Sequence, residues 1–257
     1  MVKHENFKTC DQSGFCRRNR AYADAAAKQS SSWESPYKLD PESIKFSNGV
    51  LSGTIIKTVF NSGETVRLPL TVTFLESGTA RVTVDEDKRQ KGDIVLRHDS
   101  KARKERYNEA SKWALVGGLE VSKAAALGRD AETGTTKVAY GPGSRYEAVI
   151  NHSPFGIDFR RGGSTHVRFN ERKLLNVEHW RPKKDIEKKE GDEAVVEEAS
   201  KELAEDESTW WEESFGGSTD SKPKGPESIG IDISFPNYEH VYGLAEHASS
   251  MSLKETR

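Results

Sequence analysis

The chain has 257 residues, 34% hydrophobic and 31% charged, which fits one large domain or two small ones. Its 39 basic and 41 acidic residues leave a net charge of −2, which excludes a protein that binds nucleic acid through overall positive charge. No apolar run reaches the roughly 18–20 residues of a membrane-spanning helix, and the first residues lack the apolar stretch of a secretory signal. We therefore expect no membrane span and no nucleic-acid partner. The missing secretory signal leaves two alternatives, a mature chain that starts at this residue or a cytosolic protein.

Residues 1–37 show no clear periodicity, and we predict an irregular N-terminal segment. An alanine-rich stretch within it is compatible with a short helix or a surface loop, and Trp33 and Tyr37 are expected to fill an edge of the core. The two cysteines, Cys10 and Cys16, leave a small disulfide loop and two free thiols as alternatives. No second Cys/His pair at ligand spacing accompanies them, so no metal site is predicted.

From residue 43 onwards the sequence alternates between apolar and polar residues, and Asn48-Gly49 between two such runs predicts a hairpin. Valine, isoleucine, threonine and phenylalanine, which favour strands, dominate these runs. The predicted strands cover residues 43–46, 50–59, 66–74, 79–84, 138–140, 146–152, 155–159, 165–170, 174–180 and 228–235. At least eight strands and few convincing helices predict an all-β fold, a sandwich of two sheets over residues 38–257.

Two charged stretches interrupt this pattern. Residues 85–112 are expected to form a solvated loop or helix face. Residues 183–208 hold eleven acidic residues, five lysines and no aromatic residue, which predicts an acidic flexible insertion in the sandwich. A solvated helix that touches the body of the domain is the alternative, and neither stretch is assigned a site.

No catalytic motif stands out: the chain has no G-x-S-x-G elbow, no P-loop and no H-E-x-x-H. We expect Asp232 to be a surface or loop-anchoring acid rather than a catalytic one. Asn151 begins a glycosylation sequon, but Pro154 follows it and argues against modification. The last residue, Arg257, is what a trypsin-like cleavage leaves, so the chain is expected to be a fragment of a longer protein, with a natural terminus as the alternative.

Three segments carry a resemblance to a known family. The first is residues 6–18, with its Phe-Lys-Thr-Cys and a second cysteine six positions on. The second is Trp-Glu-Glu-Ser-Phe at 211–215, with 220–226 after it, and the third is Glu-His-Val-Tyr-Gly-Leu-Ala-Glu-His-Ala at 239–248. They resemble the catalytic α subunits of endoplasmic-reticulum glucosidase II, within glycoside hydrolase family 31.

The resemblance covers essentially the whole chain, but only the front of such an enzyme. It implies a galactose-mutarotase-like N-terminal β-sandwich, followed in the family by a (β/α)₈ barrel that is not in this chain. The barrel carries two aspartates that hydrolyse α-1,3-linked glucose from N-linked glycans with retention of configuration. The resemblance thus implies an α-glucosidase whose catalytic residues lie downstream, no cofactor, and no activity in this chain alone.

The same resemblance implies site residues and partners. Tyr242, Glu246 and His247 become candidates for residues next to the substrate pocket, with a purely structural role in locking the sandwich to the barrel as the alternative. A disulfide between Cys10 and Cys16 is implied, because the compartment becomes the oxidising lumen of the endoplasmic reticulum. The implied partners are the rest of the α subunit, a β subunit that completes a heterodimer, and a glucosylated high-mannose glycan in glycoprotein quality control.

A second interpretation from a different class is a free-standing β-sandwich module that binds carbohydrate or protein. Such a module needs exposed, coplanar aromatic rings on one sheet face, whereas buried tryptophans favour a domain of a hydrolase. The tryptophans that decide between the two are Trp33, Trp113, Trp180, Trp210 and Trp211.

Overall fold

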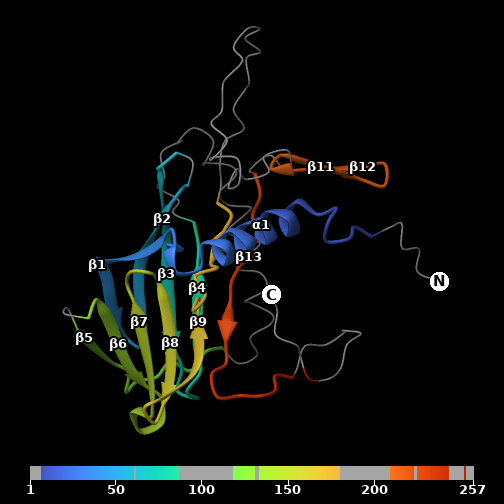
Figure 1. The fold of residues 1–257 in the computed structure, drawn as a ribbon. Helices are drawn as coiled ribbons and strands as arrows, with labels where there is room; N and C mark the ends of the chain where they lie inside the picture. The colour runs from blue at the N-terminus through green and yellow to red at the C-terminus, as the bar shows by residue number, and fades with distance from the viewer. Residues whose placement is uncertain are drawn as a thin grey trace.

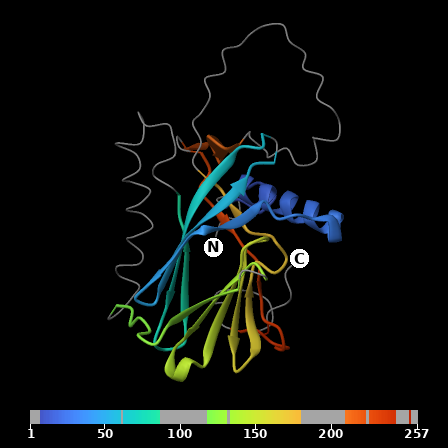
Figure 2. The same ribbon diagram turned by 90° about the vertical axis from the view of Figure 1, so that its left-hand side faces the viewer.

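Two antiparallel sheets lie face to face in the computed structural model (Figures 1 and 2), which describes residues 7–60, 62–86, 118–130, 133–179, 209–222, 225–242 and 252. The predicted insertion 183–208 and most of the charged stretch 85–112 lie outside these residues. The helical elements are α1 (Gly14–Gln29), η2 (Ser30–Ser32) and η3 (Pro142–Ser144). The strands are β1 (Tyr37–Ser47), β2 (Val50–Thr58), β3 (Thr65–Phe74), β4 (Ala80–Val84), β5 (Ala126–Asp130), β6 (Thr135–Tyr140), β7 (Tyr146–Asn151), β8 (Gly156–Arg161), β9 (Ser164–Phe169), β10 (Asn176–Val177), β11 (Glu212–Phe215), β12 (Ser218–Ser221), β13 (Ile229–Gly230) and β14 (Ile233–Ser234).

The first sheet is a meander in the order β1-β2-β3-β4. The predicted hairpin is confirmed: Asn48 and Gly49 both have positive φ, 49° and 69°, as a two-residue turn between twisted strands requires. A β-bulge between Asp40 and Lys45 shifts the pairing of β1 with β2. The register therefore keeps Leu39 and Leu51 on the buried face.

The second sheet has the order β14-β9-β8-β7-β6-β5. Its central strands match the predicted ones, and Gly162 and Gly163, both at positive φ, form the turn between β8 and β9. Strand β5 is not among the predicted strands, because its sequence, Ala-Leu-Gly-Arg-Asp, contains residues that are depleted in strands. The confirmed architecture is an all-β sandwich.

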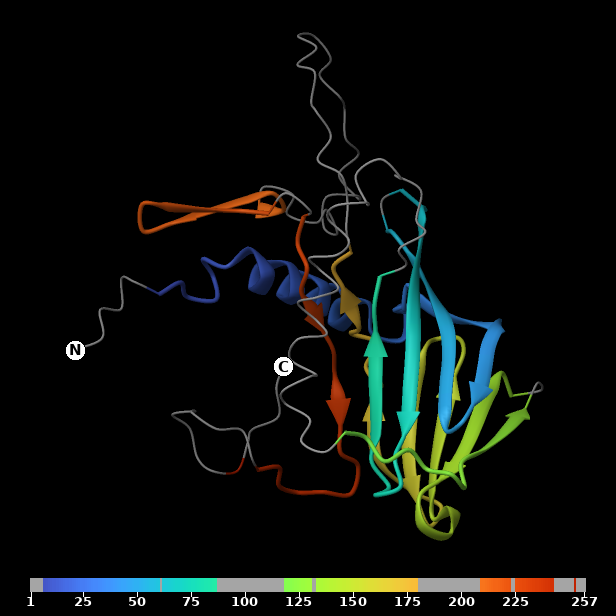
Figure 3. The same cartoon turned by 180° about the vertical axis from the view of Figure 1, so that it is seen from behind.

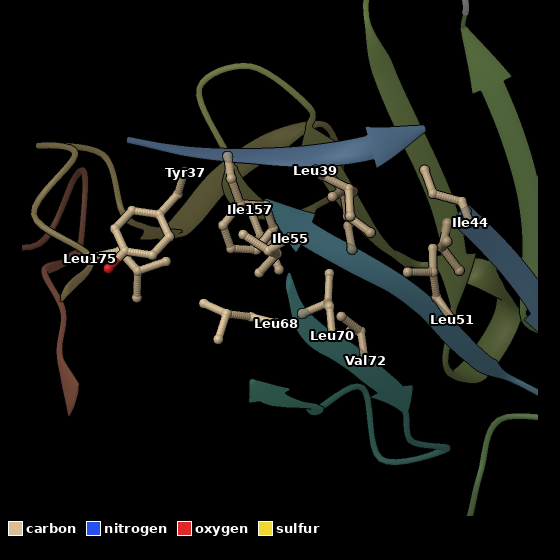
Figure 4. Close-up of a cluster of buried hydrophobic side chains, with 14 of the residues drawn as sticks. Tyr37, Leu39, Ile44, Leu51, Ile55, Leu68, Leu70, Val72, Ile157 and Leu175 are labelled. Atoms are coloured by element: carbon tan, nitrogen blue, oxygen red, sulfur yellow. The ribbon is translucent and has the colours of Figure 1, made fainter. Parts of the chain in front are cut away.

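The core lies between the two sheets. Every second residue of β3 is buried (Val66, Leu68, Leu70, Val72 and Phe74), and Val138, Ala148, Ile150 and Ile157 of the second sheet belong to the same cluster. In Figure 4, Ile55 of β2 lies beside Ile157 and near Leu68, and Leu51 of β2 lies near Ile44, all within this cluster. Each fully buried side chain of this size contributes about 1.5–3 kcal/mol. The strict alternation is therefore what fixes the register of the sheet.

The N-terminal segment corrects the prediction that residues 1–37 are irregular. Residues 14–29 form α1, which buries Arg18, Ala25 and Ala26 at helical spacing and half-buries Tyr22 on the same face. The alanines favour the helix, but small side chains and an arginine make a weak apolar stripe. Trp33 follows the helix and is 3% exposed, and its ring meets that of Tyr22 edge to face at 5.2 Å, as predicted for a core-edge residue. Among the described residues no helix is long and apolar enough to cross a membrane.

The C-terminal part corrects two further strand predictions. Residues 228–235 were expected to form one strand, but β13 pairs with β10 and β14 pairs with β9, so the chain passes from one sheet to another at Ile231 and Asp232. In place of a strand over 174–180, only β10 forms. Residues 212–221 form a separate hairpin, β11–β12, which extends to the same side of the sandwich as α1 (Figure 3).

Candidate functional site

Exposed apolar side chains gather in the last described segment of the chain. Ile229, Ile233, Phe235, Tyr238 and Tyr242 are 41% to 58% exposed, and they are five of the seven large exposed hydrophobic residues among the described residues. We call these five residues the C-terminal apolar segment. Several large exposed apolar side chains within one short segment suggest that another structure covers this segment.

Asp232 anchors this segment to the sandwich. Its carboxylate accepts hydrogen bonds from the backbone N–H groups of Arg172 at 2.7 Å and Leu174 at 3.0 Å. Its own carbonyl oxygen accepts the N–H of Asn170 at 2.9 Å. The expectation that Asp232 is a loop-anchoring acid is confirmed, and the interruption between β13 and β14 follows from these three bonds.

A side-chain contact holds the segment again beyond β14. The hydroxyl of Tyr238 lies 2.6 Å from Nδ1 of His166 on β9, and the two rings are 5.8 Å apart. Tyr242, the first of the three predicted pocket residues, is 58% exposed, and its ring lies 6.0 Å from that of His240. Glu246 and His247 lie outside the described residues, so the structure places one of the three.

A buried ion pair ties α1 to the sandwich, and sequence reasoning missed it. Nε of Arg18 donates to Oε1 of Glu178 at 2.6 Å, and both side chains are 5% exposed. Arg18 also donates to the hydroxyl of Thr209 at 2.6 Å, while the other oxygen of Glu178 accepts the N–H of Ser228 at 3.0 Å. Burial of a charge is tolerated only with such partners, so these four residues form one structural unit.

Glu213 joins the β11–β12 hairpin to the start of α1. Its carboxylate accepts the N–H of Gly14 at 2.8 Å and Nζ of Lys222 at 2.7 Å, and Lys8 lies 3.4 Å away. Burial on its own raises the pKa of Glu213, but the hydrogen bonds from Lys222 and Gly14 outweigh it and lower the pKa to about 2. Two residues of the resemblance motifs, Glu213 and Lys222, therefore have a scaffold role.

The two cysteines are free thiols in the structure, so the predicted disulfide is not formed there. Their side chains are nevertheless neighbours, because a hydrogen bond with Cys16 raises the pKa of the Cys10 thiol.

Asn151, the sequon residue, is the last residue of β7, is half-buried and pairs with both Thr135 and Gly156. Where the structure describes the chain, no group of three or more His, Cys, Asp or Glu residues could hold a metal ion.

The tryptophans do not form a sugar-stacking platform in the described part of the chain. Trp33 is buried, and Trp210 and Trp211 are half-buried with their rings at 75° to each other. Trp113 and Trp180 lie outside the described residues. Buried, non-coplanar rings favour a domain of a larger enzyme over a free-standing carbohydrate-binding module.

Comparison with known proteins places this geometry in a family. Residues 69–257 match the glycosyl hydrolase 31 N-terminal galactose mutarotase-like domain. The glucosidase 2 subunit alpha of Schizosaccharomyces pombe is 35% identical over 251 residues, which is 97% of this chain and 25% of the relative. The neutral alpha-glucosidase AB of Mus musculus is 31% identical over 269 residues, 99% of this chain and 25% of the relative.

Solved structures agree. A crystal structure of a glucosidase II alpha subunit bound to Glc1Man2 superposes with a TM-score of 0.81 at 58% identity, over 99% of this chain and 25% of that one. A second crystal structure is of an ER glucosidase II heterodimeric complex, which consists of a catalytic subunit and the binding domain of a regulatory subunit. It superposes with a TM-score of 0.80 at 59% identity, over 98% of this chain and 25% of that one. This chain spans about a quarter of the length of these relatives. It belongs to the N-terminal galactose mutarotase-like domain family of the glycosyl hydrolases 31.

Proposed function

We propose that this chain is the non-catalytic N-terminal β-sandwich of a glucosidase II α subunit. The whole polypeptide would remove α-1,3-linked glucose from N-linked glycans by retaining hydrolysis, with one carboxylate attacking the anomeric carbon and the other protonating the leaving oxygen. The C-terminal apolar segment carries this proposal. Its side chains are exposed in a chain that spans a quarter of its relatives, so the missing three quarters are the natural partner for them.

The proposal extends to compartment and partners. Relatives named glucosidase II support the lumen of the endoplasmic reticulum and a part in N-glycan processing and quality control. The heterodimeric complex supports a regulatory β subunit as second partner. Relatives named glucan 1,3-alpha-glucosidase support the glucose linkage.

Within this function, we propose that Tyr242, Glu246 and His247 lie beside the sugar site and that Tyr242 reaches it from the end of the C-terminal apolar segment. Exposure of Tyr242 at 58% supports this assignment, since its ring is available to a sugar or to a loop of the catalytic domain. The substitution Tyr242→Ala in the intact polypeptide tests whether Tyr242 contacts the substrate. A rise in KM at an unchanged kcat supports contact with substrate, and unchanged kinetics would contradict it.

The proposed function is tested by comparing residues 1–257 with the intact polypeptide on an aryl α-glucoside. We expect no turnover by residues 1–257 and turnover by the intact chain, with the α-anomer of glucose as the first product in the NMR spectrum. Turnover by the isolated, homogeneous domain would contradict the assignment of catalysis to the remainder, and release of the β-anomer would contradict retention.

A further inference from the structure

We propose that His166 is a positioning residue for the substrate-adjacent part of the chain and that it acts through Tyr238. This inference rests on the proposed function, because it assigns His166 to the same site as Tyr242. Three consecutive features of the described residues carry it: the end of the ladder, the turn that follows and the side-chain bond that closes it.

The backbone ladder that holds this segment is short. Strand β14 pairs with β9 at two positions only, Ile233 with Phe169 and Ser234 with Arg168. Two residues further along the segment is Pro236, which has no backbone N–H to donate to the edge of β9. The ladder therefore gives no hold on the chain beyond Phe235.

A tight turn then reverses the chain. The N–H of Tyr238 points to the carbonyl oxygen of Phe235 at 3.4 Å, and Asn237 has a φ of 69°. Proline at the second position and a left-handed asparagine at the third are the signature of a type II β-turn. The turn returns the chain towards β9.

The bond between Tyr238 and His166 closes this arrangement. Its length of 2.6 Å and the ring separation of 5.8 Å bring the two side chains into direct contact. His166 lies two residues before Arg168 and so shares its sheet face. Within the described part of the chain, His166 is the one side chain that hydrogen-bonds the Tyr238 hydroxyl.

The hydrogen bond between His166 and Tyr238, which we call the tether, limits how far from β9 Tyr242 can lie. An extended chain spans at most about 3.3–3.6 Å per residue, so four residues beyond Tyr238 reach about 13–14 Å. Without the tether the last fixed residue is Phe235, and seven residues reach about 23–25 Å. On its N-terminal side, loss of the bond lengthens the unheld chain before Tyr242 from four residues to seven. This widens the range of positions open to Tyr242, lowers the fraction of molecules with this residue in place and raises KM accordingly.

The first experiment measures the tether itself in residues 1–257. Backbone hydrogen exchange over 237–242, where the N–H of Tyr238 is bonded to the carbonyl oxygen of Phe235, is compared between the unsubstituted chain, Tyr238→Phe and His166→Leu. Both variants are expected to exchange faster there, whereas His166→Gln, which keeps a hydrogen-bonding group, is expected to retain protection. The matched control is Tyr22→Phe, which also loses a hydroxyl, one shared between the carbonyl oxygens of Leu175 at 3.3 Å and Lys173 at 3.5 Å, outside residues 237–242.

The second experiment measures the consequence in the intact polypeptide with an α-1,3-linked diglucoside. Tyr238→Phe and His166→Leu are expected to raise KM roughly 3- to 10-fold, the range expected for one hydrogen bond, at a kcat within about twofold. His166→Gln and Tyr22→Phe are expected to match the unsubstituted enzyme. Unchanged exchange over 237–242, or activity with an unchanged KM, would overturn the positioning role alone. An inactive unsubstituted polypeptide would overturn the proposed function and the positioning role with it.

Discussion

Nε of Arg18 lies 2.6 Å from a carboxylate oxygen of Glu178, although 160 positions separate the two residues in the chain. Both side chains are 5% exposed, and Thr209 and Ser228 complete their hydrogen bonds. A charge pair of this kind holds an element in one place rather than adding much net stability, because both charges lose their hydration. This pair is therefore one of several contacts that hold helix α1 in place on the sandwich.

Removal of one partner is expected to be strongly destabilising. Arg18→Ala leaves Glu178 charged and buried, and we expect the free energy of unfolding to fall by about 3–5 kcal/mol in urea titrations of residues 1–257. The matched control is Arg20→Ala on the same helix. The Arg20–Asp11 pair is 3.6 Å apart and well exposed, so its loss is expected to change stability by less than about 0.5 kcal/mol. Equal losses in the two variants would contradict the role of the buried pair.

Stability is expected to depend on pH through Glu213. Its pKa is lowered to about 2 in the folded chain, against about 4.3 in an unfolded one, so the ionised carboxylate stabilises the fold above pH ~4 and loses this effect as the pH falls towards 2. Glu213→Gln is expected to be less stable than the unsubstituted chain at neutral pH, and the difference is expected to narrow between pH ~4 and ~2. Urea midpoints measured across this range test the prediction, and a constant difference would refute it.

Gly78 is expected to tolerate no side chain. Its φ is 88°, and a Cβ at this position would lie 2.3 Å from the ring of Tyr146. Gly63 is the matched control, because it also has a positive φ, of 66°, but open space around it. We expect Gly63→Ala to destabilise by about 1–2 kcal/mol through backbone strain, and Gly78→Ala by clearly more, because the ring or the turn must also move. Similar thermal midpoints for the two variants would show that Tyr146 moves aside freely.

Cys10 and Cys16 are expected to form a disulfide when the chain is made in an oxidising compartment, although they are thiols in the structure. Their thiols are already neighbours, as the raised pKa of Cys10 indicates. Mass spectrometry under non-reducing conditions is expected to show the chain lighter by two hydrogen atoms, with no cysteine open to alkylation. Cys16→Ser is the control, with one alkylated cysteine. Two alkylated thiols in protein made in an oxidising compartment would contradict the pairing.

Most strands were predictable from their composition, and β3 also from its strict alternation of buried and more exposed side chains. The hairpin at Asn48 and Gly49 and the buried residues of β3 follow from period and turn chemistry. Helix α1 was predicted only as one alternative for the alanine-rich stretch. Its extent and its buried face were not predictable, since alanines and Arg18 supply that face and an arginine gives no apolar signal. The division of residues 228–235 depends on Asp232 and on amides some 60 positions earlier, which no local pattern reveals.

The candidate site was predictable only from the resemblance. Tyr242 has nothing in its spacing that indicates a sugar site. The contacts that hold its neighbourhood, such as the bond from His166 to Tyr238 across 72 positions, arise from the fold. The dipeptide Pro236-Asn237 was the one local signal that could have been read, since a proline followed by an asparagine favours a turn.

The attachment of α1 also sets an order of events during synthesis. The helix leaves the ribosome early, but Glu178, Thr209 and Glu213, to which it binds, follow their partners on it by 160, 191 and 199 residues. At about 5–20 residues per second, synthesis of that interval takes roughly 10–40 s. During this time the nascent helix has none of these partners, so it docks through all of them only after Glu213 of β11 has been synthesised.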